Sequence, residues 1–256
     1  MNHSEPICFE DFFKDDRYIL LKNYLYNYLL RKKAVEKNLH EEELDLILEI
    51  GSGISPVVTR TNRIIYTDVS HNALQILKRI QRKGRYVVAN GTELPFKAKI
   101  FSHAVCSEVL EHIQDDLMAI REISRVMVPT GCFIATFPHR KFYFSNDDRF
   151  VKHFRRYEIY EIRDLFKKAG LRLIYFQKVL GPLEKIMMNL LVYGFSIFQK
   201  FNLDLTVMPS SSTFSIILTK FFKTGNLIFM GLAWLDAKIM PRSLSTVLLV
   251  KGKLDA

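Results

Sequence analysis

Residues 46–56 read LILEIGSGISP, and they join a continuous apolar run to a glycine-rich turn. A run without polar interruption is typical of a parallel strand that is buried on both faces. Gly51 and Gly53 match the first two glycines of a G-x-G-x-x-G nucleotide loop, but Pro56 stands where the third glycine would be. The stretch therefore predicts the first strand of an open α/β sheet, which binds ligands at the carboxyl ends of its strands.

Two nucleotide ligands compete for this turn. A dinucleotide places its pyrophosphate on a helix N-terminus and uses the third glycine for close helix packing. Ser55 and Pro56 suit an N-cap and a first helical position, so we expect a helix from Pro56 with an incomplete pyrophosphate fingerprint. S-adenosylmethionine carries no phosphate, and its ammonium suits the carboxylate of Glu49. Asp68, at the end of the next expected strand, either accepts the ribose hydroxyls or caps the following helix, a task that Ser70 can also perform.

Apolar runs and amphipathic stretches alternate along residues 45–180. We expect strands at residues 45–50, 63–68, 85–90, 101–107, 131–138 and 171–180, and helices at 72–83, 111–126 and 157–170. A helix is also expected over residues 11–39, and a last strand over 245–254. This alternation predicts crossover units in a Rossmann-like α/β fold, an open, seven-stranded and mostly parallel sheet with helices on both faces.

Composition divides the chain into three parts. These are an N-terminal helical segment (1–40), a nucleotide-binding domain (41–181 and 242–256) and a hydrophobic helical insertion before the last strand (182–241). The uncharged runs of the insertion, at 186–199, 205–219 and 224–235, are shorter than the roughly 20 residues that a membrane-spanning helix needs. The insertion therefore either caps the domain with buried helices, or enters a bilayer surface or encloses an apolar substrate.

Net charge and cysteine content limit the kinds of binding partner and the cellular location that we expect. The chain has 37 Lys and Arg against 27 Asp and Glu, a net charge of +10. This indicates an anionic partner or a soluble protein that is simply rich in lysine, and the insertion favours an anionic membrane surface. Nucleic acid is disfavoured, because the basic residues are spread along the chain without an aromatic–basic RNA module. Cys8, Cys106 and Cys132 lack C-x-x-C spacing, so we expect no disulfide framework or zinc site, and a cytoplasmic location. The charge and the insertion add the expectation that the protein lies peripherally on the cytoplasmic face of the membrane.

At this point the chain resembles the class I S-adenosylmethionine-dependent methyltransferases, in particular the ubiquinone/menaquinone-type group that methylates small molecules and lipids. The motifs that carry the resemblance are, in order, LEIGSGISP, YTDVS, VVANGTELPF, FSHAVCSEVLEHIQD, REISRVMVPTGCFIATFP and KHFRRYEIYEIRDLFKKAGL. They cover residues 45–180, whereas residues 182–241 are not part of the family's common core. The resemblance implies a Rossmann-like sheet whose last strand is antiparallel.

The resemblance also implies a site for S-adenosylmethionine. By position, the contacts would be Glu49 at the ammonium, Gly51, Ser52 and Gly53 beneath the methionine part, Asp68 at the ribose, Val69, Asn90 and Gly91 around the adenine, and Ser107 and Glu108 beside the transferred methyl group. The family commonly has Asp at the positions of Asn90 and Ser102, so the chain departs from the pattern there.

Catalytic and substrate-binding residues are less well defined by the pattern. His112 and His139 are candidates for a general base, since histidine titrates near neutral pH. His139 follows the fifth expected strand, so we also expect it to contact the substrate. Four further residues form either an anion-binding wall for the substrate or a charged helix entry: His153, Arg155, Arg156 and Tyr157. No cluster of His, Cys and carboxylates has metal-ligand spacing along the chain, so the sequence predicts metal-independent transfer.

Three functions remain open. The first is methyl transfer to an apolar or lipid-linked small molecule at a membrane surface, with S-adenosylhomocysteine as the product. The second is a methyltransferase for a soluble small molecule, in which the insertion is a cap or a dimer interface. The third is a cofactor-fold membrane adaptor without catalysis, to which Asn90 and Ser102 point. The insertion and the charge favour the first, in a monomer or homodimer.

Overall fold

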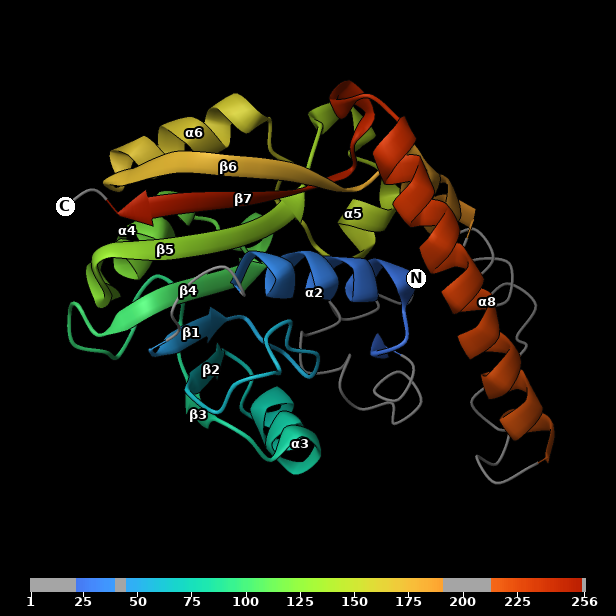
Figure 1. The fold of residues 1–256 in the computed structure, drawn as a ribbon, viewed down its shortest axis with the longest axis horizontal. Helices are drawn as coiled ribbons and strands as arrows, with labels where there is room; N and C mark the ends of the chain where they lie inside the picture. The colour runs from blue at the N-terminus through green and yellow to red at the C-terminus, as the bar shows by residue number, and fades with distance from the viewer. Residues whose placement is uncertain (1–21, 40–44, 191–212, 255–256) are drawn as a thin grey trace, which may run out of the picture.

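A seven-stranded sheet runs through the centre of the molecule (Figure 1). The computed structural model describes residues 22–39, 45–190 and 213–254. The strands lie in the order β3 (Arg85–Val88), β2 (Ile64–Asp68), β1 (Ile47–Ile50), β4 (Phe101–Ser107), β5 (Met127–Pro138), β7 (Val247–Leu254) and β6 (Leu171–Leu180). Neighbours among β1 to β5 run parallel, and β7 runs antiparallel to β5 and β6. The predicted Rossmann-like sheet with an antiparallel last strand is confirmed.

Helices lie on both faces of the sheet, as predicted (Figure 1). The longer ones are α2 (Tyr26–Leu39), α3 (His71–Gln81), α4 (Asp116–Val126), α6 (Ile159–Lys168) and α8 (Thr213–Ile239). Shorter ones are η2 (Leu110–His112), η3 (Lys141–Tyr143), α5 (Asn146–Phe150) and η5 (Arg242–Leu244). The single helix predicted over 111–126 is therefore interrupted, because the η2 turn ends before α4 begins.

Local capping sets the start of the two helices that flank the site. The side chain of Ser70 accepts a hydrogen bond from the backbone N–H of Ala73 at the start of α3. Asp115 accepts one from Met118 in the same way at the start of α4. Each cap satisfies an N–H group that has no partner inside its helix.

The central strands are buried on both faces, and their residues alternate between two apolar clusters. Leu48 and Ile50 of β1 belong to the cluster that α4 and α6 cover, whereas Ile47 belongs to the cluster that α2 and α3 cover. On β5, Phe133 points to the first cluster and Ile134 to the second. This alternation explains the continuous apolar runs of the sequence, because both faces of the sheet need apolar side chains.

The helix expected from Pro56 is not formed, and that prediction is wrong. Residues 51–63 connect β1 to β2 through turns and bends. The N–H groups of Val57 and Val58, which would open such a helix, donate instead to the two carboxylate oxygens of Glu49, at 2.7 and 3.1 Å. A buried side chain from the preceding strand has thus taken the backbone groups that the local helix signal would use.

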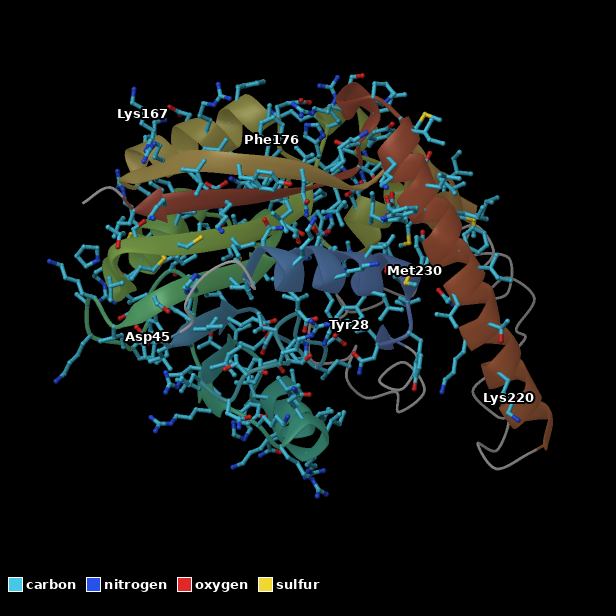
Figure 2. The ribbon with its side chains drawn as sticks, in the orientation of Figure 1. Tyr28, Asp45, Lys167, Phe176, Lys220 and Met230 are labelled. Carbon is cyan, nitrogen blue, oxygen red and sulfur yellow. The ribbon has the colours of Figure 1, made fainter. Side chains whose placement is uncertain are left out.

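Helix α2 packs along this connection. The hydroxyl of Tyr28 donates to the backbone oxygen of Pro56 at 2.8 Å, and Lys32 donates to Thr59 at 2.5 Å. Tyr28 is labelled on α2 in Figure 2. Helix α2 also contacts β5, β6 and β7, so it covers the sheet beside the glycine turn. Of the helix predicted over 11–39, residues 11–21 lie outside the described residues.

The described part of the insertion is helical, as the sequence predicts. Residues 182–190 form a helix, and α8 follows after residues 191–212, which lie outside the described residues together with Cys8 and part of the uncharged run 205–219. Helix α8 extends beyond the edge of the sheet and packs against α2 (Figure 1). Among the described residues, no helix is long and apolar enough to span a bilayer.

Candidate functional site

A cavity of about 720 Å³ lies at the carboxyl ends of β1, β2, β3 and β4. Its walls include every cofactor residue expected from the sequence except Glu49, namely Gly51, Ser52, Gly53, Asp68, Val69, Asn90, Gly91, Ser107 and Glu108. Open α/β sheets bind ligands at this edge, and small-molecule sites commonly have about this volume. The structure therefore brings together residues that are spread over 58 positions of sequence, from Gly51 to Glu108.

The glycine turn leaves no room for a side chain at its first glycine. Gly51 has φ +66°, and a Cβ there would lie 2.3 Å from Cγ2 of Val109. The backbone N–H of Ser52 donates to the carbonyl of Thr67 in β2 at 3.0 Å. The turn is therefore held against the neighbouring strand, with its backbone facing the cavity.

Asp68 fixes this turn from the end of β2. Its Oδ2 accepts the N–H of Gly53 at 2.8 Å, and its Oδ1 accepts the N–H of Ser70 at 2.9 Å. The N-cap of α3 is Ser70, so the alternative in which Asp68 caps that helix is wrong. Asp68 lines the cavity with a carboxylate whose orientation is set by two backbone groups.

Glu49 is the exception among the expected cofactor residues. It is buried behind the turn and is not in the cavity wall, and its carboxylate is occupied by the N–H groups of Val57 and Val58. Burial raises the pKa of Glu49 to about 8, against the effect of these two hydrogen bonds and of Lys32. In this geometry Glu49 holds the connection after β1, and its contact with the ammonium of a cofactor stays a prediction.

The residues expected around the adenine lie on the rim of the cavity. Val69 is 64% exposed. Asn90 uses Oδ1 to accept the N–H of Thr92 at 3.1 Å, which closes a turn after β3. A Cβ at Gly91 would lie 3.2 Å from Cδ1 of Ile113. Asn90 thus has a local structural role, which suits an amide as well as the carboxylate that the family commonly has here.

The opposite side of the cavity follows β4. Ser107 bonds to Thr136 of β5, with 2.8 Å between the hydroxyl oxygens. Glu108 has φ +55°, and its N–H donates to the carbonyl of Thr136 at 3.0 Å. Its Oε2 lies 3.9 Å from Nη1 of Arg31 on α2. Beyond Glu108, the residues that we call the acceptor wall are His112, Ile113, Val151 and Phe154.

Sequence reasoning missed two basic residues of the cavity, Lys22 and Arg31. Nζ of Lys22 lies 3.8 Å from the position that a Cβ of Gly53 would occupy. Burial and, to a smaller extent, Arg31 lower the pKa of Lys22 to about 8, against an opposing effect of Asp68. The basic and aromatic pattern of residues 11–39 was the available signal, but nothing in it shows that this segment reaches the carboxyl ends of the strands.

His112 and His153 meet at the acceptor wall. Their ring centroids are 4.6 Å apart in an edge-to-face arrangement. Burial, with a smaller effect of the nearby His153, lowers the pKa of His112 to about 4. Glu111 lies beside them and is fully buried, and burial raises its pKa well above the ordinary value, with a further rise caused by Glu108.

The remaining predicted residues are engaged elsewhere. His139 is buried and bonds through Nδ1 to the hydroxyl of Ser245 at 2.6 Å, so the structure does not bring this catalytic candidate to the cavity. Arg155 pairs with Asp116 at 2.9 Å, and Arg156 is buried.

The anion-binding wall predicted from this segment does not line the cavity. Arg156 pairs with Asp148 at 2.8 Å, and the hydroxyl of Tyr157 donates to Asp116 at 2.8 Å. Side chains that were expected to bind a substrate anion thus bind carboxylates of the protein itself. Of this group, His153 contacts the acceptor wall through His112.

Comparison with known proteins agrees with the fold. Residues 48–135 match the methyltransferase domain family. An uncharacterized protein of Methanocaldococcus jannaschii is 29% identical over 184 residues, which cover 68% of this chain and 74% of that protein. A second uncharacterized protein of the same organism is 33% identical over 108 residues, 41% of this chain and 42% of that protein.

Solved structures share the fold. A chain of the complex between the Haloferax volcanii Trm112 methyltransferase activator and a methyltransferase has a TM-score of 0.61, with 15% identity over 99% of this chain and all of that one. An S-adenosylmethionine-dependent methyltransferase of Thermotoga maritima has a TM-score of 0.59, with 18% identity and 94% coverage of both chains. Phosphoethanolamine N-methyltransferase 2 of Haemonchus contortus, bound to S-adenosylmethionine, has a TM-score of 0.58, with 16% identity over 98% of this chain and 61% of that one.

The match of residues 48–135 to the methyltransferase domain family supports an enzyme that transfers methyl groups from S-adenosylmethionine, and the solved structures share its fold. The comparisons do not single out the ubiquinone/menaquinone-type group, and they do not show the acceptor of this chain. The acceptor must therefore be argued from this chain.

Proposed function

We propose that the protein transfers the methyl group of S-adenosylmethionine to an apolar or lipid-linked small molecule at an anionic membrane surface. The observation that carries the proposal is the connection between the cavity and α8. Helix α2 contributes Tyr28 and Arg31 to the cavity, and its other contacts include α8. Helix α8 presents large apolar side chains to solvent, so the cavity lies next to a surface that suits a bilayer.

The cofactor part of the proposal follows from the turn after β1. A pyrophosphate needs the N–H groups of a helix N-terminus. Residues 51–63 form no helix, and the N–H groups of Val57 and Val58 are already taken by Glu49. S-adenosylmethionine needs a close backbone approach, which Gly51 provides, and a carboxylate for its ribose, which Asp68 provides. The site therefore favours the sulfonium cofactor over a dinucleotide.

Methyl transfer from a sulfonium is an in-line displacement. The bond between carbon and sulfur breaks as the acceptor bonds to the methyl carbon, and S-adenosylhomocysteine leaves as a neutral thioether. The cofactor is already activated, so alignment of the acceptor supplies much of the catalysis, up to about 7–11 kcal/mol in favourable cases. The acceptor wall can align an apolar group through Ile113, Val151 and Phe154, and it carries His112 as the candidate catalytic residue.

Helix α8 has apolar side chains on both of its sides. Phe229, Met230 and Ala233 face the protein and pack in the cluster that α2 covers; Met230 is labelled near this contact in Figure 2. The opposite side is solvent-exposed and carries Leu227, Ile228, Leu232, Trp234, Leu235 and Ile239. A helix with apolar side chains on two opposite sides needs an apolar partner on each of them.

The polar residues of α8 suit an interface with lipid headgroups. Nζ of Lys238 lies 4.1 Å from the ring centroid of Trp234, and Lys223 lies 3.9 Å from the ring of Tyr24. Lys220 lies on the part of α8 that extends past the sheet (Figure 2). Tryptophan and lysine side by side are typical of helices that lie in the bilayer interface, where anionic lipids attract the lysines.

Vesicle binding tests the membrane part. We expect the protein to sediment with vesicles of phosphatidylglycerol and phosphatidylcholine, and less with phosphatidylcholine alone. The double variant Ile228→Glu, Leu232→Glu places two charges on the exposed side of α8 and should weaken the partition at least about tenfold, since each buried isoleucine or leucine contributes about 1.5–3 kcal/mol. Ile174→Glu, on the edge strand β6, is the matched control and should leave the partition unchanged.

Two results would contradict this part of the proposal. One is equal recovery with and without anionic vesicles. The other is a stable dimer in detergent-free buffer that the double variant disrupts, which would assign the exposed side of α8 to a dimer interface. That outcome would favour the alternative, a methyltransferase for a soluble small molecule.

The acceptor class is tested by labelling. The protein is incubated with S-adenosylmethionine that carries a radioactive methyl group and with a total membrane-lipid extract or a water-soluble metabolite extract. We expect label in the organic phase of the lipid sample. Label that appears only in the water-soluble sample would overturn the lipid-linked acceptor. The absence of transfer to either, combined with intact cofactor binding, would instead support a non-catalytic adaptor.

A further inference from the structure

Three potential metal ligands meet at the acceptor wall, from two segments of the chain. Glu111 and His112 lie in the η2 turn after β4, and His153 lies after α5. One ligand atom of each residue lies within 4.8 Å of the other two. The backbone N–H of Phe154 donates to the carbonyl of Glu111 at 2.9 Å, so the two segments are fixed to each other next to these side chains.

Glu111 has a carboxylate that the protein does not satisfy. The residue has 0% relative exposure, and no other residue donates a hydrogen bond to either carboxylate oxygen. The nearest cationic candidate is Nε2 of His153, at 3.7 Å from Oε1. A buried polar group without a partner is costly, and in native structures such a group commonly marks a functional site or a missing ion.

His153 is oriented by a second carboxylate. Its Nδ1 lies 2.8 Å from Oδ1 of Asp148, so Nε2 is the nitrogen that faces Glu111. Asp148 is itself held by Arg156 and Lys185, each at 2.8 Å. Histidine ligands of metals characteristically use the second ring nitrogen in this way, because the carboxylate fixes the ring and increases its basicity.

His112 is the member of the group that reaches the cavity. A backbone hydrogen bond with Lys152 holds its ring, which packs edge-to-face with the ring of His153. His112 lines the cavity between Val109 and Ile113. A ligand at this position is therefore accessible both to solvent ions and to an acceptor that occupies the cavity.

We propose that Glu111, His112 and His153 bind a divalent transition-metal cation, of the type of Zn²⁺ or Mn²⁺, at the acceptor wall. Two imidazoles and one carboxylate are a donor set for these ions, and they leave coordination positions open for water or substrate. A cation about 2.1 Å from each ligand requires ligand atoms within about 4.2 Å of one another, so small side-chain rotations close the site. The sequence predicts metal independence because the ligands are 41 positions apart, from His112 to His153.

The ion would also define the acceptor atom, and this step rests on the proposed function. An acceptor hydroxyl that binds the ion loses its proton more readily, since a bound cation can lower the pKa of a coordinated water to about 7. The proton leaves to solvent, the oxygen bonds to the methyl carbon, and the sulfonium becomes a thioether. The structure thus points to an oxygen acceptor rather than to an amine, which needs no metal activation.

Direct metal binding tests the site without reference to catalysis. The full-length protein is treated with a chelator, and Mn²⁺ is titrated while the free ion is followed by electron paramagnetic resonance; Zn²⁺ is titrated by calorimetry. We expect one ion per chain. Glu111→Gln and His153→Asn should each weaken binding at least about 100-fold. His71→Asn, at the exposed start of α3, is the matched control and should bind as the wild type does.

Stability of the metal-free variants separates a lost ligand from a lost fold. Glu111→Gln removes a buried unsatisfied carboxylate, so its metal-free melting temperature should equal or exceed that of the wild type. The inference is overturned if the wild type binds no ion, or if folded Glu111→Gln and His153→Asn bind it as tightly as the wild type. Cofactor binding is measured on the same samples. If the wild type binds the cofactor but no metal ion, the metal site alone is rejected. If the wild type does not bind the cofactor at all, the proposed function is rejected.

Discussion

The two sides of the cavity are built in different ways. The cofactor side consists of backbone turns that directly follow β1, β2 and β3, and its key contacts join neighbouring strands, such as Gly53 to Asp68. The acceptor wall consists of side chains from distant segments, such as His112 and Phe154. The cofactor side, which is formed by backbone, depends on a few glycines and carboxylates at fixed positions. The acceptor wall, which is formed by side chains, depends on how remote segments of the chain pack together.

The largest effect is expected on the cofactor side, from Gly51→Val. The new side chain would overlap Val109, and the residue would keep a positive φ, which a β-branched residue adopts with difficulty. We expect S-adenosylmethionine binding to become undetectable by calorimetry and stability to fall by about 1–3 kcal/mol. Far-ultraviolet circular dichroism should still show a folded protein.

Gly170→Ala is the control for this prediction. It also places a side chain at positive φ, but nothing lies within 4 Å of the added carbon. Stability should fall by about 1 kcal/mol, and cofactor affinity should not change. If Gly51→Val retains cofactor binding, the glycine turn is not the site that holds the methionine part.

The same contrast explains what the sequence could predict. The bounds of β4 and β6 agree with the prediction at every residue, Phe101–Ser107 and Leu171–Leu180. For the central strand β4 this follows from burial on both faces, which requires a largely apolar run. The shared position of the expected cofactor residues other than Glu49 was also predictable, since each lies at or shortly after the carboxyl end of a strand. These features depend on local sequence and on the general geometry of parallel sheets.

The errors arise where a tertiary contact competes with a local signal. Ser55 and Pro56 are a good helix start, yet Glu49 binds the N–H groups of Val57 and Val58, and the side chain of Ser55 is left without a hydrogen-bond partner. In the same way, His139 follows a strand as expected for a site residue but bonds to Ser245 instead. Neither contact can be read from residue spacing, because each joins segments that meet only in the folded chain.

The second prediction concerns the end of β2, where Asp68 is proposed to bind the cofactor and Ser70 caps α3. Asp68→Asn keeps the size of the side chain and removes its charge, so the two backbone bonds persist in part while the ribose loses its anionic acceptor. Cofactor affinity should fall about 10- to 100-fold, as expected for loss of one charged hydrogen bond of about 1.5–3 kcal/mol. Isothermal titration calorimetry measures it.

Ser70→Ala is the matched variant, because it removes the cap of α3 two residues away. It should lower stability by about 1 kcal/mol and leave cofactor affinity nearly unchanged. The opposite pattern, with Ser70→Ala weakening the cofactor and Asp68→Asn weakening only the fold, would reverse the roles that we assign to these residues.

The smallest effect on cofactor binding is expected from Glu49→Gln, which instead changes how stability depends on pH. Burial raises the pKa of Glu49 to about 8 in the folded protein, against 4.5 as its ordinary value. Between these values the unfolded chain binds fewer protons than the folded chain, so the contribution of Glu49 to stability falls as pH rises, by at most about 1.4 kcal/mol per pH unit. Glu49→Gln lacks this dependence, although it loses one acceptor for the N–H groups of Val57 and Val58.

Urea unfolding at several values between about pH 5 and 8 measures the difference in stability between variant and wild type. That difference should shift in favour of Glu49→Gln as pH rises. Glu122→Gln is the control: a hydrogen bond from Arg125 lowers the pKa of Glu122, so its contribution is present above the ordinary pKa and is lost only in more acidic solution. A difference for Glu49→Gln that stays constant over this range would show that Glu49 is ionised throughout. The two backbone N–H groups would then hold a charge behind the glycine turn, close enough to attract the ammonium of the cofactor after all.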